Sequence, residues 1–115
     1  MRIAIIDDYQ QVARTAADWR AVEALAAVTV FTRPWRDEDE IVHALAPFEV
    51  VVLMRERTAF PERLIARLPK LALVAMTGHR TTTLDIAACT RRGIVVSHTT
   101  ANRSSAPAEL AFALI

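Results

Sequence analysis

The apolar run Val50–Met54 passes directly into the charged residues 55–58, and this junction constrains the fold more than any other feature. Five consecutive apolar residues, three of them β-branched, with charges at one end only, indicate a strand buried on both faces in a parallel sheet. The charged residues then emerge at the strand's carboxyl end, where open α/β sheets place their ligands. Arg55 and Arg57 beside Thr58 suit a carboxylate or phosphate, although the same residues also fit a merely solvated loop.

Similar short apolar runs alternate with stretches of helical periodicity along the 115 residues. One helix or two short ones are predicted between the first two strands and one helix in each later gap, and the predicted strands cover residues 3–6, 28–32, 50–54, 71–76 and 94–96. This alternation predicts a parallel sheet with helices on both faces. Five strands and four crossovers resemble an α/β flavodoxin-like layout, a three-layer sandwich with the strand order 2-1-3-4-5.

In that order the first and third strands are neighbours. Asp7 and Asp8, which end the first strand, are therefore expected to lie near residues 55–58, with residues 77–80 on the other side of the third strand. Asp7 and Asp8 themselves are interpreted as solvated turn residues.

Two pairs of polar residues have the spacing of a capping box. Asp37 with Glu40, and Thr82 with Asp85, are each three residues apart at the start of a predicted helix. Gly93 follows the last of these helices, where a glycine commonly ends a helix.

Composition argues against several classes of function. The formal net charge is +1 without long basic runs, so no nucleic acid is expected as a partner. No apolar stretch has the length of a membrane span, and no signal peptide is evident, so no membrane is expected either. The single cysteine, Cys89, is interpreted as a packed helix residue; it allows no internal disulfide and fits a cytoplasmic protein. The three histidines, at positions 43, 79 and 98, show no metal-ligand spacing, so no metal is expected.

The sequence contains only two glycines, Gly78 and Gly93. A dinucleotide fingerprint needs several glycines where a strand turns into a helix, so no cofactor-binding residue is predicted in this chain. His79 is interpreted as a loop residue that contributes mainly its backbone, and His98 as the end of a strand. Neither has a placeable partner that would make it catalytic.

Residues 104–115 depart from the pattern, since they are apolar nearly all round and Glu109 is their one charge. A helix of this kind needs cover on every side. We expect residues 1–103 to form the flavodoxin-like domain, and residues 104–115 to begin a crossover helix toward an absent second domain. We also expect a homo-oligomer that buries this helix. A terminal helix packed on its own domain is the alternative.

Three stretches, at the expected spacing, resemble one family, the D-isomer-specific 2-hydroxyacid dehydrogenases. Residues 53–58, Leu-Met-Arg-Glu-Arg-Thr, resemble the third-strand loop of its N-terminal substrate-binding domain. Residues 77–85, Thr-Gly-His-Arg-Thr-Thr-Thr-Leu-Asp, resemble its Ala-Gly-x-Gly-x-Asp/Thr-Asn-x-Asp loop. Residues 107–110, Pro-Ala-Glu-Leu, resemble the start of the helix that crosses into the cofactor domain. The resemblance spans essentially the whole chain.

The resemblance implies a domain that binds a small 2-hydroxy or 2-keto acid, in an oxidoreductase that uses NAD or NADP on the CH–OH group of D-2-hydroxy acids. Backbone amides near Gly78 and His79, next to Thr77, would hold the substrate carboxylate. Four residues would line the other side of the cleft: Arg55, Glu56, Arg57 and Thr58. A fixed carboxylate is what a 2-keto acid needs so that hydride reaches one face only.

Two residues depart from the family's pattern. Arg80 replaces the second glycine of the loop, and Glu56 stands where a small hydroxyl residue is common. Glu56 is expected either to neutralise one arginine or to select a substrate with a positive group. The family's hydride-transfer residues lie with the nicotinamide in a second domain. No catalytic residue and no bound cofactor are therefore expected in this chain, and no activity is expected from it alone.

Two other functions fit the same layout. A phospho-receiver domain needs an aspartate at the end of the third strand and a lysine after the fifth, but Met54 and Arg55 stand at the first place and His98 with threonines at the second. A non-catalytic interaction or dimerisation module is compatible with every pattern above and stays open.

Overall fold

The predicted strands form one parallel sheet in the order β2-β1-β3-β4-β5, which confirms the flavodoxin-like layout. The computed structural model describes residues 1–78 and 82–99. The strands are β1 (Arg2–Ile5), β2 (Ala27–Val30), β3 (Val50–Met54), β4 (Leu73–Thr77) and β5 (Val95–His98). Each begins and ends within two residues of its predicted bounds. The buried run Val50–Met54 is the central strand, as its composition required.

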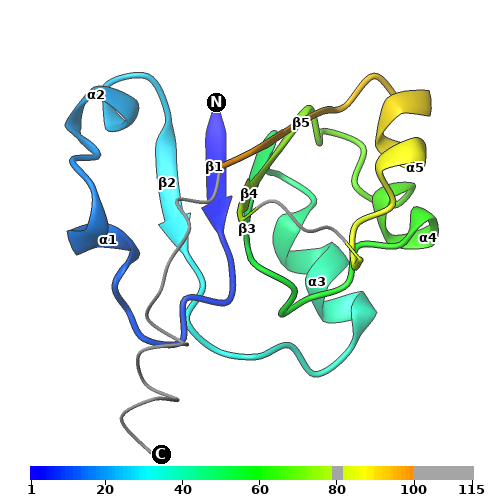
Figure 1. Ribbon diagram of the computed structural model, residues 1–115, viewed down its shortest axis with the longest axis horizontal. Helices are drawn as coiled ribbons and strands as arrows, with labels where there is room; N and C mark the ends of the chain where they lie inside the picture. Colours follow the sequence, from blue (N-terminus) through cyan, green and yellow to red (C-terminus); the bar gives the residue numbers. More distant parts are fainter. Residues whose placement is uncertain (79–81, 100–115) are drawn as a thin grey trace, which may run out of the picture.

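Helices cover both faces of the sheet and make it a three-layer sandwich. They are α1 (Ala13–Ala16), α2 (Arg20–Glu23), α3 (Glu38–Leu45), α4 (Glu62–Ile65) and α5 (Ile86–Arg91). Helices α3, α4 and α5 lie on one side, and α1 and α2 lie on the other (Figure 1). The segment between β1 and β2 thus forms two short helices, one of the two predicted arrangements. The predicted crossover helix at residues 104–115, with its role in self-association, lies outside the described residues and stays a prediction.

The main hydrophobic core fills the space between the sheet and helices α3, α4 and α5. Alternate residues of the central strands, together with Ile6 just after β1, face these helices and are buried; the strand residues are Ala4, Val51, Leu53, Val74 and Met76. Cys89 of α5 is fully buried in the same core, which confirms that it is a packed helix residue. Desolvation by burial, with a smaller contribution from the charge of Asp85, raises the pKa of the Cys89 thiol.

The helix ends show which capping predictions hold. The Asp37 carboxylate accepts a hydrogen bond from the Glu40 N–H at 2.8 Å, as predicted for α3, while the Glu40 carboxylate accepts from the N–H of Arg36 at 2.6 Å. At α5 the prediction was wrong, because Asp85, not Thr82, is the N-cap and accepts from the Ala88 N–H at 2.9 Å. The Thr82 hydroxyl is instead bonded to Glu56, in the loop after β3.

The predicted glycine terminus of α5 is confirmed. Gly93 has a φ of +69°, in the left-handed region that suits glycine. Its N–H donates to the carbonyl of Thr90 at 3.1 Å, and the N–H of Ile94 donates to the carbonyl of Cys89 at 2.9 Å. These two bonds are a Schellman motif, which ends the helix and aims the chain into β5.

Replacing Asp37 with alanine is expected to lower the free energy of unfolding by about 1 kcal/mol, because it removes the side-chain acceptor at the start of α3. Asp37→Asn should retain most of the stability, since asparagine caps almost as well. Urea unfolding measures both variants. Asp39→Ala is the matched control, because this carboxylate is 83% exposed and its ion pair with Arg67 lies at the surface. Equal losses for Asp37→Ala and Asp39→Ala would contradict the capping role.

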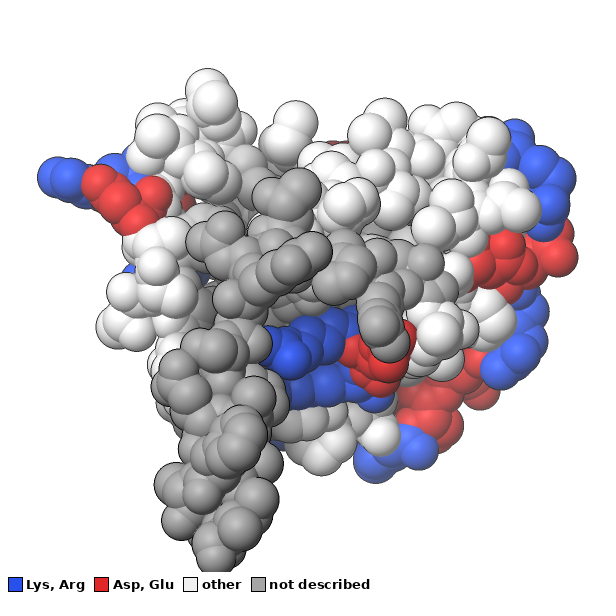
Figure 2. All heavy atoms as spheres, viewed as in Figure 1, with Lys and Arg blue, Asp and Glu red and all other residues white. Residues whose placement is uncertain are grey.

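Charged side chains of both signs alternate along the side of the molecule formed by α3, α4 and α5 (Figure 2). Ion pairs here join Glu38 to Arg63 at 3.0 Å, Asp39 to Arg67 at 2.7 Å and Glu62 to Arg91 at 2.8 Å. Exposed pairs of this kind are worth about 1 kcal/mol at most, so burial beneath the helices contributes more to their docking than these pairs do.

Two features of the described residues bear on function. No helix within residues 1–78 and 82–99 is long and apolar enough to cross a membrane. In the same residues no group of three or more His, Cys, Asp or Glu side chains is placed to hold a metal ion.

Candidate functional site

The loops after β1 and β3 meet at the carboxyl edge of the sheet, as the strand order predicted. The Arg57 guanidinium donates a hydrogen bond to the backbone carbonyl of Asp7 at 2.6 Å. The Thr58 hydroxyl donates to the Asp7 carboxylate at 2.5 Å. These contacts join residues about fifty positions apart in the chain, because β1 and β3 are neighbours in the sheet.

The interpretation of Asp7 and Asp8 as solvated turn residues was wrong, since they are 1% and 3% exposed. The Asp8 carboxylate accepts from the backbone N–H groups of Val12 at 3.1 Å and Ala13 at 3.0 Å, so it satisfies the first turn of α1. Asp7 accepts from Thr58. A buried carboxylate needs donors of this kind, and here the neighbouring elements supply them.

Arg57 is exposed, but its guanidinium is fixed at this corner of the molecule by two contacts. Its guanidinium carbon lies 5.0 Å from the centre of the Tyr9 ring, in addition to the bond with the Asp7 carbonyl. Desolvation raises the pKa of the Tyr9 hydroxyl, and the charge of Asp7 and the hydrogen bond to it raise this pKa further. The charge of Arg57 lowers the pKa and so partly offsets these effects. Arg57 and Thr58, both predicted to line the cleft, are therefore bonded to Asp7.

Arg55 directly follows β3 and is exposed, as Arg57 is. Its φ of +52° is in the left-handed region, which is unusual for a long side chain and is typical of strain at functional positions. Its N–H donates to the Thr77 hydroxyl at 3.1 Å, and that hydroxyl donates to the Leu53 carbonyl at 3.3 Å. Within the described part of the chain, the exposed Arg55 guanidinium has no hydrogen bond or ion pair.

Glu56 joins the loop after β3 to the segment before α5. Its carboxylate accepts from the Thr82 hydroxyl at 2.5 Å and from the Thr82 N–H at 3.3 Å. Phe60 strengthens this junction, because its N–H donates to the carbonyl of Thr83 at 2.7 Å. The two loops that the sequence predicted on either side of the cleft are therefore bonded to each other.

Gly78 continues β4 with a φ of +105°, which a side chain rarely adopts. Its N–H donates to the hydroxyl of Thr99, just after β5, at 2.8 Å. Sequence reasoning did not single out Thr99, since a threonine after a strand carries no local signal. His79 lies outside the described residues. His98 ends β5, as predicted.

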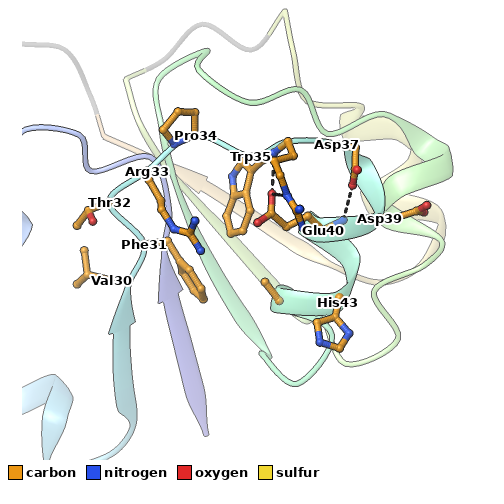
Figure 3. A pocket seen from close by; sticks show the side chains of 12 residues that line it. Val30, Phe31, Thr32, Arg33, Pro34, Trp35, Asp37, Asp39, Glu40 and His43 are labelled. Carbon is orange, nitrogen blue, oxygen red and sulfur yellow. Dashed lines mark hydrogen bonds and ion pairs between the residues drawn. The ribbon is translucent and has the colours of Figure 1, made fainter.

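Two pockets flank this corner, and neither is lined by Arg55 or Gly78. One of about 350 Å³ includes Tyr9, Trp35, Arg57 and Thr58 in its lining. The other, of about 620 Å³, lies between the end of β2 and helix α3 and shares Trp35 with the first (Figure 3). Its acids have partners in the protein, as the dashed bonds of Figure 3 show for Asp37 and Glu40. The candidate anion site at the ends of β3 and β4, with Arg55 and Gly78, is therefore separate from both pockets.

Residues 3–113 match the family model described as D-isomer specific 2-hydroxyacid dehydrogenase, catalytic domain. A phosphoglycerate oxidoreductase from Vibrio cholerae is 40% identical, with a TM-score of 0.83 over 99% of this chain and 36% of its own. A putative D-3-phosphoglycerate dehydrogenase oxidoreductase from Ralstonia solanacearum is 34% identical, with a TM-score of 0.84 over 98% and 34%. A D-lactate dehydrogenase from Aquifex aeolicus, solved with NAD and lactic acid, shares the fold at 20% identity and a TM-score of 0.71, over 97% and 32%.

The chain thus spans about a third of the length of the solved structures it matches. None of the curated proteins compared with it matches. The family match covers almost the whole chain, and the solved structures that are 34–40% identical share its fold. The chain belongs to the family of D-isomer-specific 2-hydroxyacid dehydrogenase catalytic domains.

Proposed function

We propose that this chain is the substrate-binding domain of an NAD(P)-dependent oxidoreductase, and that it binds the carboxylate of a small 2-hydroxy or 2-keto acid at the carboxyl edge of β3 and β4. The observation that carries the proposal is the placement of Arg55 beside the Gly78 turn. The Arg55 N–H bond to Thr77 fixes the two strand ends against each other at 3.1 Å, while the guanidinium stays exposed. Arginine and backbone amides are the donors that a carboxylate prefers.

The same placement supports a role in orientation. A keto acid held by its carboxylate presents one face of its carbonyl group, and fixing that face is worth a large part of a hydride-transfer barrier. Glu56 stands at the rim, bonded to Thr82, and a substrate with a positive group would meet its carboxylate there. The similar proteins from Vibrio cholerae and Ralstonia solanacearum are named for phosphoglycerate, so phosphoglycerate is a second acid to test beside glyoxylate.

The cofactor is assigned to another domain. The two glycines of the chain, Gly78 and Gly93, do not form the fingerprint that cradles a pyrophosphate, so the residues present do not fit NAD or NADP. We therefore propose that this chain binds the acid without a cofactor and transfers no hydride alone. The hydride-transfer residues would belong to the cofactor domain that the family's longer proteins carry.

Titration with glyoxylate tests the proposal, with chloride at equal ionic strength as the reference. We expect the backbone amide resonance of Gly78 to shift with millimolar ligand, and Arg55→Gln to weaken binding about tenfold, because it removes a charge-assisted donor. Arg20→Gln is the matched control, since this exposed arginine pairs with Asp18 at α2. Equal affinities for Arg55→Gln and the wild type would exclude Arg55 as a ligand. No response of the wild type would leave the interaction module as the function.

A further inference from the structure

The hydrogen bonding between β3, β4 and β5 continues past the ends of the strands. The regular ladder pairs Met54 with Thr77 and Met76 with His98. One residue further on, the N–H of Thr99 still donates to the carbonyl of Met76 at 3.1 Å. This bond anchors the backbone of Thr99 beside the end of β4, close to Gly78.

Beyond the strand ends, side-chain hydroxyl groups replace backbone carbonyls as the acceptors of these hydrogen bonds. The N–H of Arg55, just after β3, donates to the hydroxyl of Thr77 on β4 at 3.1 Å. The N–H of Gly78, just after β4, donates to the hydroxyl of Thr99 after β5 at 2.8 Å. In both cases the first residue beyond a strand is held by a threonine at the end of, or just after, the next strand in the sheet.

The two residues held in this way both have left-handed backbones. The φ angle is +52° at Arg55 and +105° at Gly78. Such conformations persist only where surrounding contacts fix them, particularly for a residue with a side chain. Each threonine hydroxyl accepts a bond from the N–H of the left-handed residue itself, so it restrains the turn directly.

We propose that Thr99 is a positioning residue for carboxylate binding. Its hydroxyl holds the backbone of Gly78 beside the proposed anion site, as the Thr77 hydroxyl holds the backbone of Arg55. The inference rests on the proposed function, because it concerns the same anion site. Thr99 acts through the turn rather than on the acid, since its hydroxyl is bonded to the Gly78 N–H. Its effect is therefore independent of Arg55.

Thr99→Val tests this proposal, because valine keeps the shape of threonine and removes the hydroxyl. We expect glyoxylate to bind about two- to tenfold more weakly, the range for losing one neutral hydrogen bond. Thr99→Ser should restore the wild-type affinity. Thr90→Val is the matched control: its exposed hydroxyl donates to the Ile86 carbonyl at 3.0 Å within α5, so the same kind of bond is lost away from the site.

A second readout separates positioning from a general loss of structure. Hydrogen exchange of the Gly78 amide should be faster in Thr99→Val than in the wild type and in Thr99→Ser, while core amides such as Val51 keep their protection. The affinity loss from Thr99→Val should persist in an Arg55→Gln background, whereas the loss from Thr77→Val should largely vanish there, because Thr77 acts through Arg55.

The outcomes separate the two proposals. Unchanged affinity in Thr99→Val, with glyoxylate binding to the wild type, overturns the positioning role alone. Tighter binding in Thr99→Val overturns it too, because it would make the hydroxyl a competitor for the Gly78 amide. A wild type that does not respond to glyoxylate overturns the proposed function, and the positioning role with it. Unchanged Gly78 exchange also counts against the role.

Discussion

Replacing Phe60 with alanine is expected to lower the free energy of unfolding by about 3–5 kcal/mol, the range for emptying the site of a buried aromatic ring. Phe60 is 0% exposed and belongs to the main core together with Leu64 and Leu84. The loss is a large fraction of the total stability of a domain of this size, which is about 5–15 kcal/mol. Urea denaturation, followed by circular dichroism, measures the shift of the midpoint.

Two comparison variants make this result specific. Phe60→Leu should cost less than Phe60→Ala, because leucine fills most of the space that the ring occupies. Leu25→Ala should change stability by no more than about 0.5 kcal/mol, since Leu25 is 82% exposed. If Phe60→Ala were no more costly than Leu25→Ala, the loop after β3 would not be part of the cooperative core.

The fold could be predicted because its signals are local. The run Val50–Met54 identifies the central strand by composition alone, and the alternation of strands and helices leaves few topologies. The cap at Asp37 was equally accessible, since donor and acceptor lie three residues apart in the chain. Each of these features depends on residues that are close in sequence.

The predictions that were wrong depend instead on contacts between residues that are far apart in the sequence. Thr82 and Asp85 have the right spacing for a capping box, but a long-range contact with Glu56 engages the Thr82 hydroxyl, and Asp85 caps the helix instead. In the sequence Asp7 and Asp8 resemble exposed turn residues. In the fold they are buried, because the loop after β3 bonds to Asp7 and the start of α1 bonds to Asp8. No spacing in the sequence encodes these partners, because they meet only after the sheet has assembled.

The sequence predicted where the candidate site lies in the fold, but it did not predict the contacts of its individual side chains. The meeting of the loops after β1 and β3 with the end of β4 followed from the strand order, and it is confirmed by the bonds of Arg57 to Asp7 and of Arg55 to Thr77. The sequence could not distinguish the two arginines. Their contacts do so: both are exposed, but the Arg57 guanidinium contacts the Asp7 carbonyl and the Tyr9 ring, whereas within the described residues the Arg55 guanidinium has no hydrogen bond or ion pair.

Replacing Asp7 with alanine is expected to lower the free energy of unfolding by about 1.5–3 kcal/mol, the range for hydrogen bonds to a charged group. Two effects compete. Removing a buried carboxylate relieves its desolvation, but it leaves the Thr58 hydroxyl without its acceptor at 2.5 Å and places alanine at a φ of +60°. The second effect should dominate, because the Tyr9 hydroxyl also donates to this carboxylate, at 3.2 Å.

Asp7→Asn and Thr58→Val resolve the competition. Asparagine tolerates the left-handed backbone and keeps an oxygen for the Thr58 hydroxyl, so Asp7→Asn should lose less than Asp7→Ala. Because Asp7 and Thr58 are in contact, the double variant Asp7→Ala with Thr58→Val should cost less than the sum of the two single losses. Chemical denaturation of the wild type, Asp7→Ala, Thr58→Val and the double variant measures the coupling energy. Strict additivity would mean that the bond between Asp7 and Thr58 contributes no coupling energy and that other contacts hold the loop carrying Arg55. An alanine variant as stable as the wild type would mean that desolvation of the carboxylate outweighs its hydrogen bonds.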